Sequence, residues 1–359
     1  MTHTCSNANQ PAQIAAMKAA AASRNVPFLD ADIDSLPKIG DGVHPTLDGH
    51  RTLADTLAAE IAAIPTVKPG TLLGYKVWDG TDLRDVTGWK FYDGTDLTTA
   101  RVERLPSGYD TSAAMLAQEP FYIAHRGGSK DYPEHSLLAY TQAVRHEFGA
   151  LELALARTSD GVWFGLHDDS LDRTSLGTGG GTGTQLVASQ MTWAEVQQYV
   201  INLPAGTSGR LPQPYMRWEE YVETYYASHV TFIDIKAAFS HRTELLNMMD
   251  ALPGNPRQRF VAKYYGKQYG GWAQDASARG YKTWGYFYAG DGATIDQWAD
   301  KWDILGLSYD APAGDWSSFV GTGKPVVGHI CPDQAAADTA LAKGAAGLMV
   351  SGVTSVDPT

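Results

Sequence analysis

The sequence predicts an α/β protein whose main part is a (β/α)8 TIM barrel, preceded by a small α/β fragment and a β-hairpin connector. The chain has 359 residues, of which 43% are hydrophobic, so it can form a barrel of roughly 240 residues and a smaller unit. From Glu119 onward, short strand-like runs alternate with helical patterns, as in parallel βαβ units. The number of these runs is close to eight, which favours a closed barrel over an open sheet.

Residues 1–65 form the first predicted unit. An Ala-rich helix is expected over 14–23 and a short strand over 26–30. A second helix is expected over 45–64, because its apolar residues recur at helical spacing on one face.

A short sequence repeat marks residues 66–117 as a connector. Trp78-Asp-Gly-Thr-Asp-Leu83 recurs as Tyr92-Asp-Gly-Thr-Asp-Leu97. Asp-Gly between strand-like residues is a hairpin signal, so two short β-hairpins are expected. Two copies are too few for a solenoid.

The barrel is expected over residues 118–359. Helices are expected over 136–147, 192–200 and 218–227. The strand candidates are 121–124, 149–156, 162–166, 230–235, 260–264, 283–288, 304–308, 325–330 and 347–350. Functional sites of TIM barrels form at the C-terminal ends of the strands, so the side chains that follow these runs are the first candidates for function.

Histidines and charged residues are concentrated where several of these strands should end. The clusters are His125-Arg126-Gly-Gly, Pro133-Glu134-His135-Ser136, Glu152, His167-Asp168, Leu171-Asp-Arg-Thr174 and Asp234-Ile-Lys236. If the barrel is correct, these clusters meet at its mouth.

The order and spacing of these clusters resemble the glycerophosphodiester phosphodiesterase family. The family pattern runs His-Arg-Gly, Pro-Glu-Asn, Glu-x-Asp, Thr-x-Asp-Gly, His-Asp, Leu-x-Arg-Thr and Glu-x-Lys, and each block has an exact or near counterpart here. Gly344-Ala-Ala-Gly-Leu-Met349 also looks like the family's last helix–strand turn. The resemblance covers residues 119–355 and implies a phosphoric diester hydrolase that acts on glycerol-phosphate-type diesters.

The resemblance also implies a role for each matching residue. These roles are acid–base catalysis for His125 and His167, phosphate binding for Arg126 and Lys236, and coordination of a divalent cation, Ca²⁺ or Mg²⁺, for Glu152 and Asp234. The chemistry is consistent, because two imidazoles can divide the proton transfers at neutral pH. Arginine and lysine can neutralise a phosphate, and carboxylates can bind a hard cation that contacts phosphate oxygens.

Three positions depart from the family pattern. The Asp of Glu-x-Asp is Ala154, the Asn of Pro-Glu-Asn is His135, and the Glu of Glu-x-Lys is Asp234. The metal site therefore lacks one carboxylate, and its affinity for a cation should fall. Glu134 is a candidate replacement ligand.

Further residues are candidates for substrate contacts. Lys263, Tyr288 and His329 end later strands, where a pocket would form. His135 stays open between a substrate contact and a surface turn. Asp234 and Lys236 alternate on one strand, and a purely structural ion pair is the alternative for them.

A second resemblance lies in the first unit. Asp41-Gly-Val-His44 looks like the last block of SGNH-type (GDSL) esterases, in which an Asp and a His complete a triad with an earlier serine. The Gly-Asp-Ser block is absent from this sequence, so Asp41 and His44 have no visible nucleophile. We interpret residues 1–65 as a C-terminal fragment of such a hydrolase.

The order of these units resembles minor tail proteins of phages that infect actinobacteria. The resemblance implies an extracellular or virion-associated protein and a bacterial envelope polymer, such as teichoic acid, as the substrate. The sequence shows no secretory signal, so we expect another route of delivery or a longer parent chain.

Composition argues against several other classes. With 40 acidic and 28 basic residues, the net charge is −12, which disfavours nucleic acid as the partner. No apolar run approaches the ~18 residues of a membrane span. Cys5 and Cys331 lie near opposite ends and are expected to be free thiols. The sequence leaves open whether the chain forms a homo-oligomer.

Two alternative functions stay open. Ala154 is also consistent with a barrel that has lost turnover and serves as a receptor-binding module for an envelope glycan or phosphate polymer. An Asp in place of the Glu of Glu-x-Lys is shared with spider-venom-type phospholipases D, which makes lipid cleavage the second alternative.

Overall fold

The structure, a computed structural model, describes residues 76–78, 83–85, 88–92, 97–101, 105–177, 184–202 and 212–358. The chain divides into two compact units between Arg104 and Leu105. The expected hydrolase fragment, with Asp41 and His44, lies outside the described residues, as does Cys5.

Two antiparallel strand pairs precede the barrel. Strand β1 (Lys76–Trp78) pairs with β2 (Leu83–Asp85), and β3 (Gly88–Tyr92) pairs with β4 (Leu97–Arg101). Each pair flanks one copy of Asp-Gly-Thr-Asp, with Trp78 opposite Leu83 and Tyr92 opposite Leu97. This is the pairing that the repeated sequence predicts.

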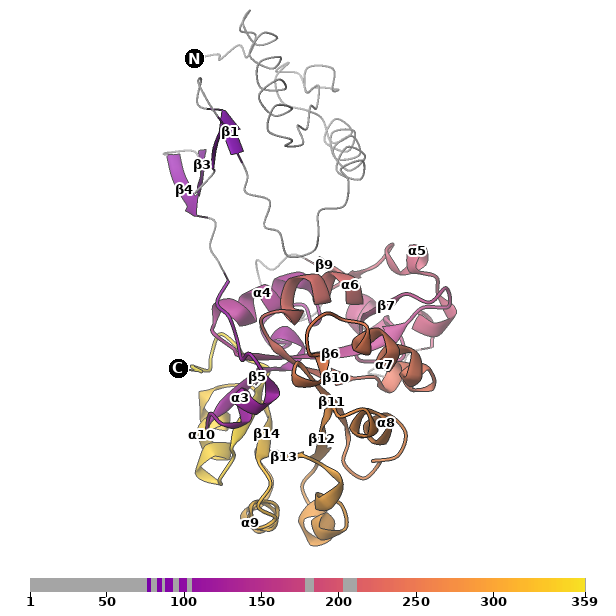
Figure 1. Cartoon of the computed structure of the whole chain (residues 1–359), viewed down its shortest axis with the longest axis vertical. Helices are drawn as coiled ribbons and strands as arrows, with labels where there is room; N and C mark the ends of the chain where they lie inside the picture. The colour runs from indigo at the N-terminus through magenta and orange to yellow at the C-terminus, as the bar shows by residue number, and fades with distance from the viewer. Residues whose placement is uncertain are drawn as a thin grey trace, which may run out of the picture. The chain divides into compact units, whose positions relative to one another are not determined.

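Eight parallel strands close into a barrel in the second unit (Figure 1). They are β5 (Phe121–Ala124), β6 (Ala150–Arg157), β10 (Val230–Asp234), β11 (Phe260–Tyr265), β12 (Lys282–Phe287), β13 (Ile304–Ser308), β14 (Val326–Cys331) and β15 (Gly347–Val350). Each strand pairs with the next, and β15 pairs with β5 to close the ring. The predicted TIM barrel is therefore confirmed.

Helices cover the outside of this barrel (Figure 1). They are α4 (Leu137–Arg145), α7 (Arg242–Asp250), α8 (Trp272–Ala278), α9 (Ala313–Gly321) and α10 (Gln334–Ala342). Helix α4 begins where the sequence predicts a helix, because the Ser136 side chain accepts a hydrogen bond from the Ala139 backbone N–H at 3.1 Å. No helix within the described residues is long and apolar enough to cross a membrane.

Alternating strand residues point into the barrel, and large apolar side chains fill its N-terminal half. Phe121, Phe232, Trp284 and Ile304 are fully buried in one cluster inside the ring. Met115 of α3 (Ser112–Leu116) belongs to the same cluster and closes that end. The sequence places the domain boundary between residues 117 and 118, whereas the compact unit begins at Leu105. The reason is that residues 105–117 supply Met115 to the core of the barrel.

Three expected elements differ in the structure. The candidate strand at 162–166 is β7 (Trp163–Gly165), which runs antiparallel to β6 and is not one of the barrel strands. The helix expected over 192–200 is only α5 (Trp193–Val196), which a capping box at Thr192 starts. The helix expected over 218–227 is α6 (Trp218–Tyr221), continued by a π-turn at Val222–Tyr226.

Candidate active site

Strand register places the central carboxylates of the site on the inner face of the barrel. Glu152 lies opposite Phe232, and Ala154 lies opposite Asp234. Since side chains alternate along a strand, Glu152, Ala154 and Asp234 share the face that Phe232 buries in the interior. Glu152 and Asp234 are fully buried.

A strained turn after β5 positions the first histidine. Arg126 has φ 52° and ψ 31°, a left-handed conformation that is costly for a residue with a Cβ. This conformation directs the Arg126 backbone N–H to Glu152 Oε2 at 2.7 Å. Gly128, at φ 99°, must be glycine, because a Cβ there would lie 2.6 Å from Val353. The buried His125 ring is held by its Nδ1, 3.0 Å from Ser129 Oγ.

A continuous chain of ion pairs connects this turn to the second histidine. Arg126 Nη1 lies 3.2 Å from Glu134 Oε2, and Arg173 donates to both oxygens of Glu134 at 2.7 and 3.0 Å. Arg173 Nε donates to Asp168 Oδ2 at 2.5 Å, and Asp168 Oδ1 lies 2.7 Å from His167 Nδ1. The network fixes the orientation of the His167 ring.

Glu134 belongs to this network rather than to a metal site. It was expected as a replacement metal ligand, but both of its oxygens accept hydrogen bonds from Arg173. Burial opposes its ionisation, yet Arg126 and Arg173 outweigh burial and hold the pKa of Glu134 well below the usual range. Glu134 is therefore a charged structural residue.

The ammonium groups of two lysines lie close to the Asp234 carboxylate. Lys236 Nζ lies 2.6 Å from His167 Nε2 and 3.6 Å from Asp234 Oδ2. Lys263 Nζ lies 2.6 Å from Glu152 Oε1 and 3.4 Å from the same Asp234 oxygen. Both lysines therefore lie at the site, and Asp234 with Lys236 is part of a larger charge cluster rather than an isolated pair.

The electrostatics of the site favour neutral imidazoles in the free protein. Burial and the charge of Arg126 hold the pKa of His125 well below its ordinary value. Burial and Arg126 also lower the pKa of His167, although its bond to Asp168 acts in the opposite direction. The network assigns the Nδ1–H tautomer to His167, with Nε2 as the acceptor facing Lys236. Both rings can therefore accept a proton.

The residues at the site do not fit the expected divalent cation. The described part of the chain contains no group of three or more His, Cys, Asp or Glu residues that could hold a metal ion. Glu152 has both oxygens engaged, one by the Arg126 backbone and one by Lys263. Ala154 offers only a methyl group where the family pattern has a carboxylate.

His135 is placed differently from the expected substrate contact. It is 1% exposed, and its Nδ1 lies 2.8 Å from the Tyr140 hydroxyl, which donates to the Glu152 backbone carbonyl at 2.9 Å. His135 and Tyr140 therefore brace β6 behind the carboxylate, so the structure favours neither a substrate contact nor a surface turn.

The remaining two candidates lie at the mouth of the barrel. Tyr288 is 52% exposed, with its ring centroid 6.1 Å from that of His329 and 6.0 Å from that of Tyr286. His329 is buried, and its Nε2 lies 3.0 Å from the carbonyl of Phe287. Tyr288 is therefore accessible to a ligand, whereas His329 packs beneath it.

Sequence reasoning gave no role to several residues that complete the site. Arg173 and Asp168 lie inside the motifs Leu171–Thr174 and His167-Asp168, so the sequence does carry a signal for them. Tyr140 lies within a predicted helix, and no sequence signal marked its contact with β6. Tyr286 also had no signal beyond its position on a strand.

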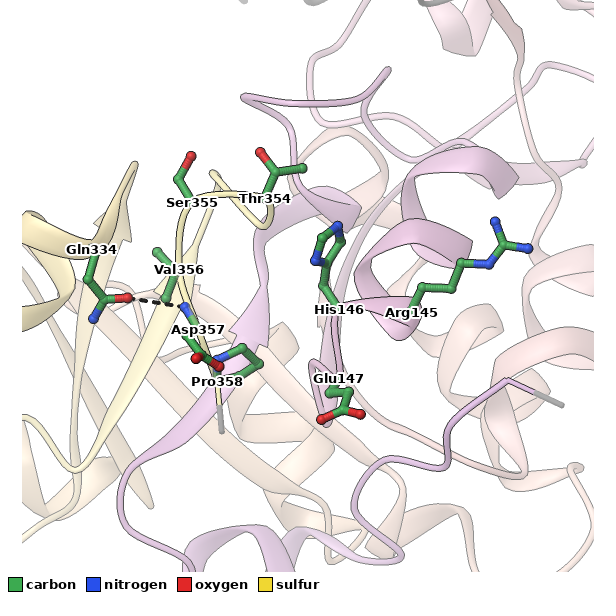
Figure 2. Close-up of a pocket in the computed structure, with 9 residues that line it drawn as sticks. All are labelled: Arg145, His146, Glu147, Gln334, Thr354, Ser355, Val356, Asp357 and Pro358. Atoms are coloured by element: carbon green, nitrogen blue, oxygen red, sulfur yellow. Dashed lines mark hydrogen bonds between the residues drawn. The ribbon is translucent and has the colours of Figure 1, made fainter. Parts of the chain in front are cut away.

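The hollow shown in Figure 2 is separate from this set of residues. It has a volume of about 560 Å³, and the Gln334 side chain accepts a hydrogen bond from the Asp357 backbone N–H at its wall. It is lined by Arg145, His146, Glu147, Gln334 and residues 354–358. None of the candidate catalytic residues is among them.

A family model described as the glycerophosphoryl diester phosphodiesterase family matches residues 125–288, from the first histidine to the exposed tyrosine. Residues 125–288 form a glycerophosphodiester phosphodiesterase family domain. The resemblance of the motifs is therefore confirmed for this part of the chain.

Curated relatives of this family match over short segments. The chain is 39% identical over 84 residues to the protein of Mycobacterium tuberculosis named "Probable glycerophosphodiester phosphodiesterase 1", a match that covers 23% of this chain and 28% of that protein. It is 49% identical over 57 residues to human glycerophosphodiester phosphodiesterase 1, which covers 16% of this chain and 17% of the human protein. The matches thus span less than a third of either relative.

Solved structures of the family share the fold over the whole barrel. A glycerophosphoryl diester phosphodiesterase from Parabacteroides distasonis aligns with a TM-score of 0.53 and 16% identity, covering 69% of this chain and 91% of that one. An Oleispira antarctica phosphodiesterase, solved with the product sn-glycerol-3-phosphate, aligns with a TM-score of 0.50 and 15% identity. That alignment covers 66% of this chain and 95% of the other. At these identities, the likeness establishes the barrel fold.

Proposed function

We propose that the barrel hydrolyses glycerol-phosphate-type diesters with His125 and His167 as its acid–base pair. The observation that carries this proposal is the grouping of both imidazoles with the cations Lys236 and Lys263 around one pair of buried carboxylates, beside the Arg126–Glu134 ion pair. A phosphodiester carries one negative charge, and more negative charge develops on its oxygens in the transition state. Preorganised cations stabilise that charge. The family domain at residues 125–288 supports the same reaction class.

The proton transfers follow from the partners of the two histidines. An incoming phosphate offers Lys236 a better acceptor than His167 Nε2, and its negative charge favours protonation of that nitrogen. Asp168 stabilises the resulting imidazolium, so we assign proton donation to His167 and proton acceptance to His125. This division resembles other sites in which the environments of two groups separate their pKa values.

The proposed reaction proceeds in two steps. A neighbouring hydroxyl of the glycerol attacks phosphorus and transfers its proton to His125, while the bond to the leaving alcohol breaks and the leaving oxygen takes a proton from His167. Water then attacks the cyclic phosphate and transfers a proton to His167, and His125 returns its proton to the glycerol oxygen. Both histidines are restored, and glycerol phosphate is the product. The Oleispira neighbour with bound sn-glycerol-3-phosphate is consistent with this class of product.

The larger substrate that we propose is a glycerol-phosphate polymer of a bacterial cell envelope, such as a teichoic acid. The support is the order of units in the sequence, which resembles a phage tail protein that meets this polymer outside the cell. The half-exposed Tyr288 at the barrel mouth offers a surface on which a long chain can extend beyond the reacting phosphate.

Hydrolysis of three substrates tests the function. The protein is incubated with glycerophosphocholine, a polyglycerol-phosphate polymer and a lysophospholipid, and the released glycerol phosphate or choline is measured. We expect His125→Ala and His167→Ala each to lower turnover by about 10²–10⁴-fold. His146→Ala, at the hollow of Figure 2, serves as the matched control with unchanged turnover.

Each other outcome contradicts the proposal in a distinct way. Binding of the polymer without hydrolysis supports the receptor-binding module. Choline release from the lysophospholipid alone supports cleavage of the phospholipase D type. Hydrolysis that survives both histidine substitutions removes the acid–base assignment.

A further inference from the structure

We propose that the Lys263 ammonium group occupies the place of the divalent cation in this barrel, so that phosphodiester hydrolysis here needs no metal ion. The inference rests on the proposed function and concerns the same site. Its starting point is the contact between Lys263 Nζ and Glu152 Oε1, at 2.6 Å, deep inside the ring of strands.

Of the two carboxylates expected to bind a cation, Glu152 is already engaged by hydrogen bonds, whereas Asp234 Oδ2 makes only ion-pair contacts with lysines. Glu152 Oε1 bonds to Lys263, and Glu152 Oε2 accepts the Arg126 backbone N–H at 2.7 Å. Asp234 Oδ2 lies 3.4 Å from Lys263 Nζ, so the ammonium lies between both carboxylates. A hard cation needs about six oxygen ligands, and in this arrangement it would have to displace Lys263 to reach Glu152 Oε1.

The missing carboxylate at Ala154 and the ammonium of Lys263 compensate for each other in charge. The register places Ala154 directly opposite Asp234 on the inner face, which is where a third carboxylate would have pointed. Two carboxylates with a monovalent ammonium retain the near balance that three carboxylates would have with a divalent ion. Three carboxylates with one ammonium would leave more negative charge buried, and two buried carboxylates without Lys263 would have too little counter-charge.

Aromatic rings hold the ammonium from the other side. Lys263 Nζ lies 5.3 Å from the ring centroid of Tyr286 and 5.7 Å from that of Trp284, distances at which ring faces attract an ammonium. Trp284 is fully buried, and Tyr286 is 9% exposed. Aromatic rings are not ligands for Mg²⁺ or Ca²⁺, so this side of the site is built for a side-chain cation.

The lysine also takes over the role of the metal toward the substrate. Lys263 and Lys236 both lie within 4 Å of Asp234 Oδ2, at 3.4 and 3.6 Å, so two like charges are held close together. An anion that enters beside them relieves this repulsion and gains attraction from both lysines and from Arg126. The three side-chain cations thereby supply the charge neutralisation that a metal ion would supply.

Calorimetry on the full chain tests the inference without relying on turnover. We expect no saturable binding of Ca²⁺ or Mg²⁺ tighter than about 1 mM, the weak end of protein calcium sites. We also expect hydrolysis of glycerophosphocholine to be unchanged by excess chelator. One bound cation per chain with saturable heat, or loss of hydrolysis in chelator, would overturn the inference.

A variant designed to bind a metal ion provides a second test, in which the expected result is the appearance of binding. Ala154→Asp combined with Lys263→Ser restores the third carboxylate and removes the ammonium, so this double variant should bind one Ca²⁺ and melt at a higher temperature when Ca²⁺ is added. Ala154→Asp alone should gain no such binding while Lys263 remains. Lys282→Ser, which removes a lysine 3.0 Å from Asp303 outside the site, is the matched control.

The outcomes separate this inference from the proposed function. If no diester is cleaved, calorimetry on the unaltered protein still decides whether a cation binds. If diesters are cleaved and Lys263→Ser keeps the full rate in chelator, the neutralising role of Lys263 is refuted while the proposed function stands.

Discussion

Arg173 connects the two halves of the site, and its replacement by methionine should destabilise the barrel measurably. Methionine keeps much of the length of the side chain and removes the guanidinium. The change deletes hydrogen bonds of 2.5 Å to Asp168 and of 2.7 and 3.0 Å to Glu134. Glu134 and Asp168 have side chains only 6% and 4% exposed, so water cannot readily replace the lost donors.

The expected loss is about 3 kcal/mol of unfolding free energy. Removing one partner of a buried ion pair costs about 3–5 kcal/mol, because the remaining charge stays buried. The lower end applies, since Glu134 keeps Arg126 and Asp168 keeps His167 as partners. For a unit of this size, each kcal/mol lowers the melting temperature by about 2–4 °C, so we expect a decrease of about 6–12 °C.

Urea unfolding and thermal melting followed by circular dichroism measure this loss. Arg157→Met is the matched control, because Arg157 has a similarly exposed side chain but pairs with the more exposed Glu244 at 3.0 Å. We expect the control to lose about 1 kcal/mol or less. An equal loss in both variants, or a loss below about 1 kcal/mol for Arg173→Met, would refute the view that burial of the carboxylates makes this network costly to break.

Two further predictions concern pH and the support of β6. Burial lowers the pKa of His135 and His329 to about 4 in the folded protein, so below pH ~6.5 the unfolded chain binds more protons. Stability should therefore fall from pH ~6.5 toward 4.5, before most carboxylates titrate, and a urea midpoint that stays constant over this window would disagree. Tyr140→Phe should cost about 1–3 kcal/mol, because it leaves the Glu152 carbonyl and His135 Nδ1 without their shared hydroxyl. Chemical denaturation at pH 7 measures this cost, and a variant as stable as the parent would contradict it.

Much of the fold was predictable because strand and helix signals are local. Alternating runs after Glu119 predicted the barrel, and the repeated Asp-Gly-Thr-Asp predicted two antiparallel pairs. The segment at 162–166 was ambiguous, since a short apolar run has the same appearance whether it joins the barrel or folds back on β6. Its antiparallel pairing depends on contacts that the local pattern does not contain.

The sequence by itself determined the types of chemical group at the strand ends. His125, Arg126, His167 and Lys236 stand in motifs whose order indicates the family, and each lies in the site. Composition also determined the acidic charge of the chain. These properties follow from residue type and order, which the sequence states directly.

Only the tertiary structure decided which groups pair. Glu134 and His135 are adjacent in sequence, yet Glu134 neutralises two arginines while His135 braces Tyr140. Lys263 is far along the chain from Glu152, and closure of the barrel brings its ammonium to 2.6 Å from that carboxylate. The physical reason is that charge pairing depends on distance and burial across the ring of strands. Spacing along the chain fixes neither until the ring is closed.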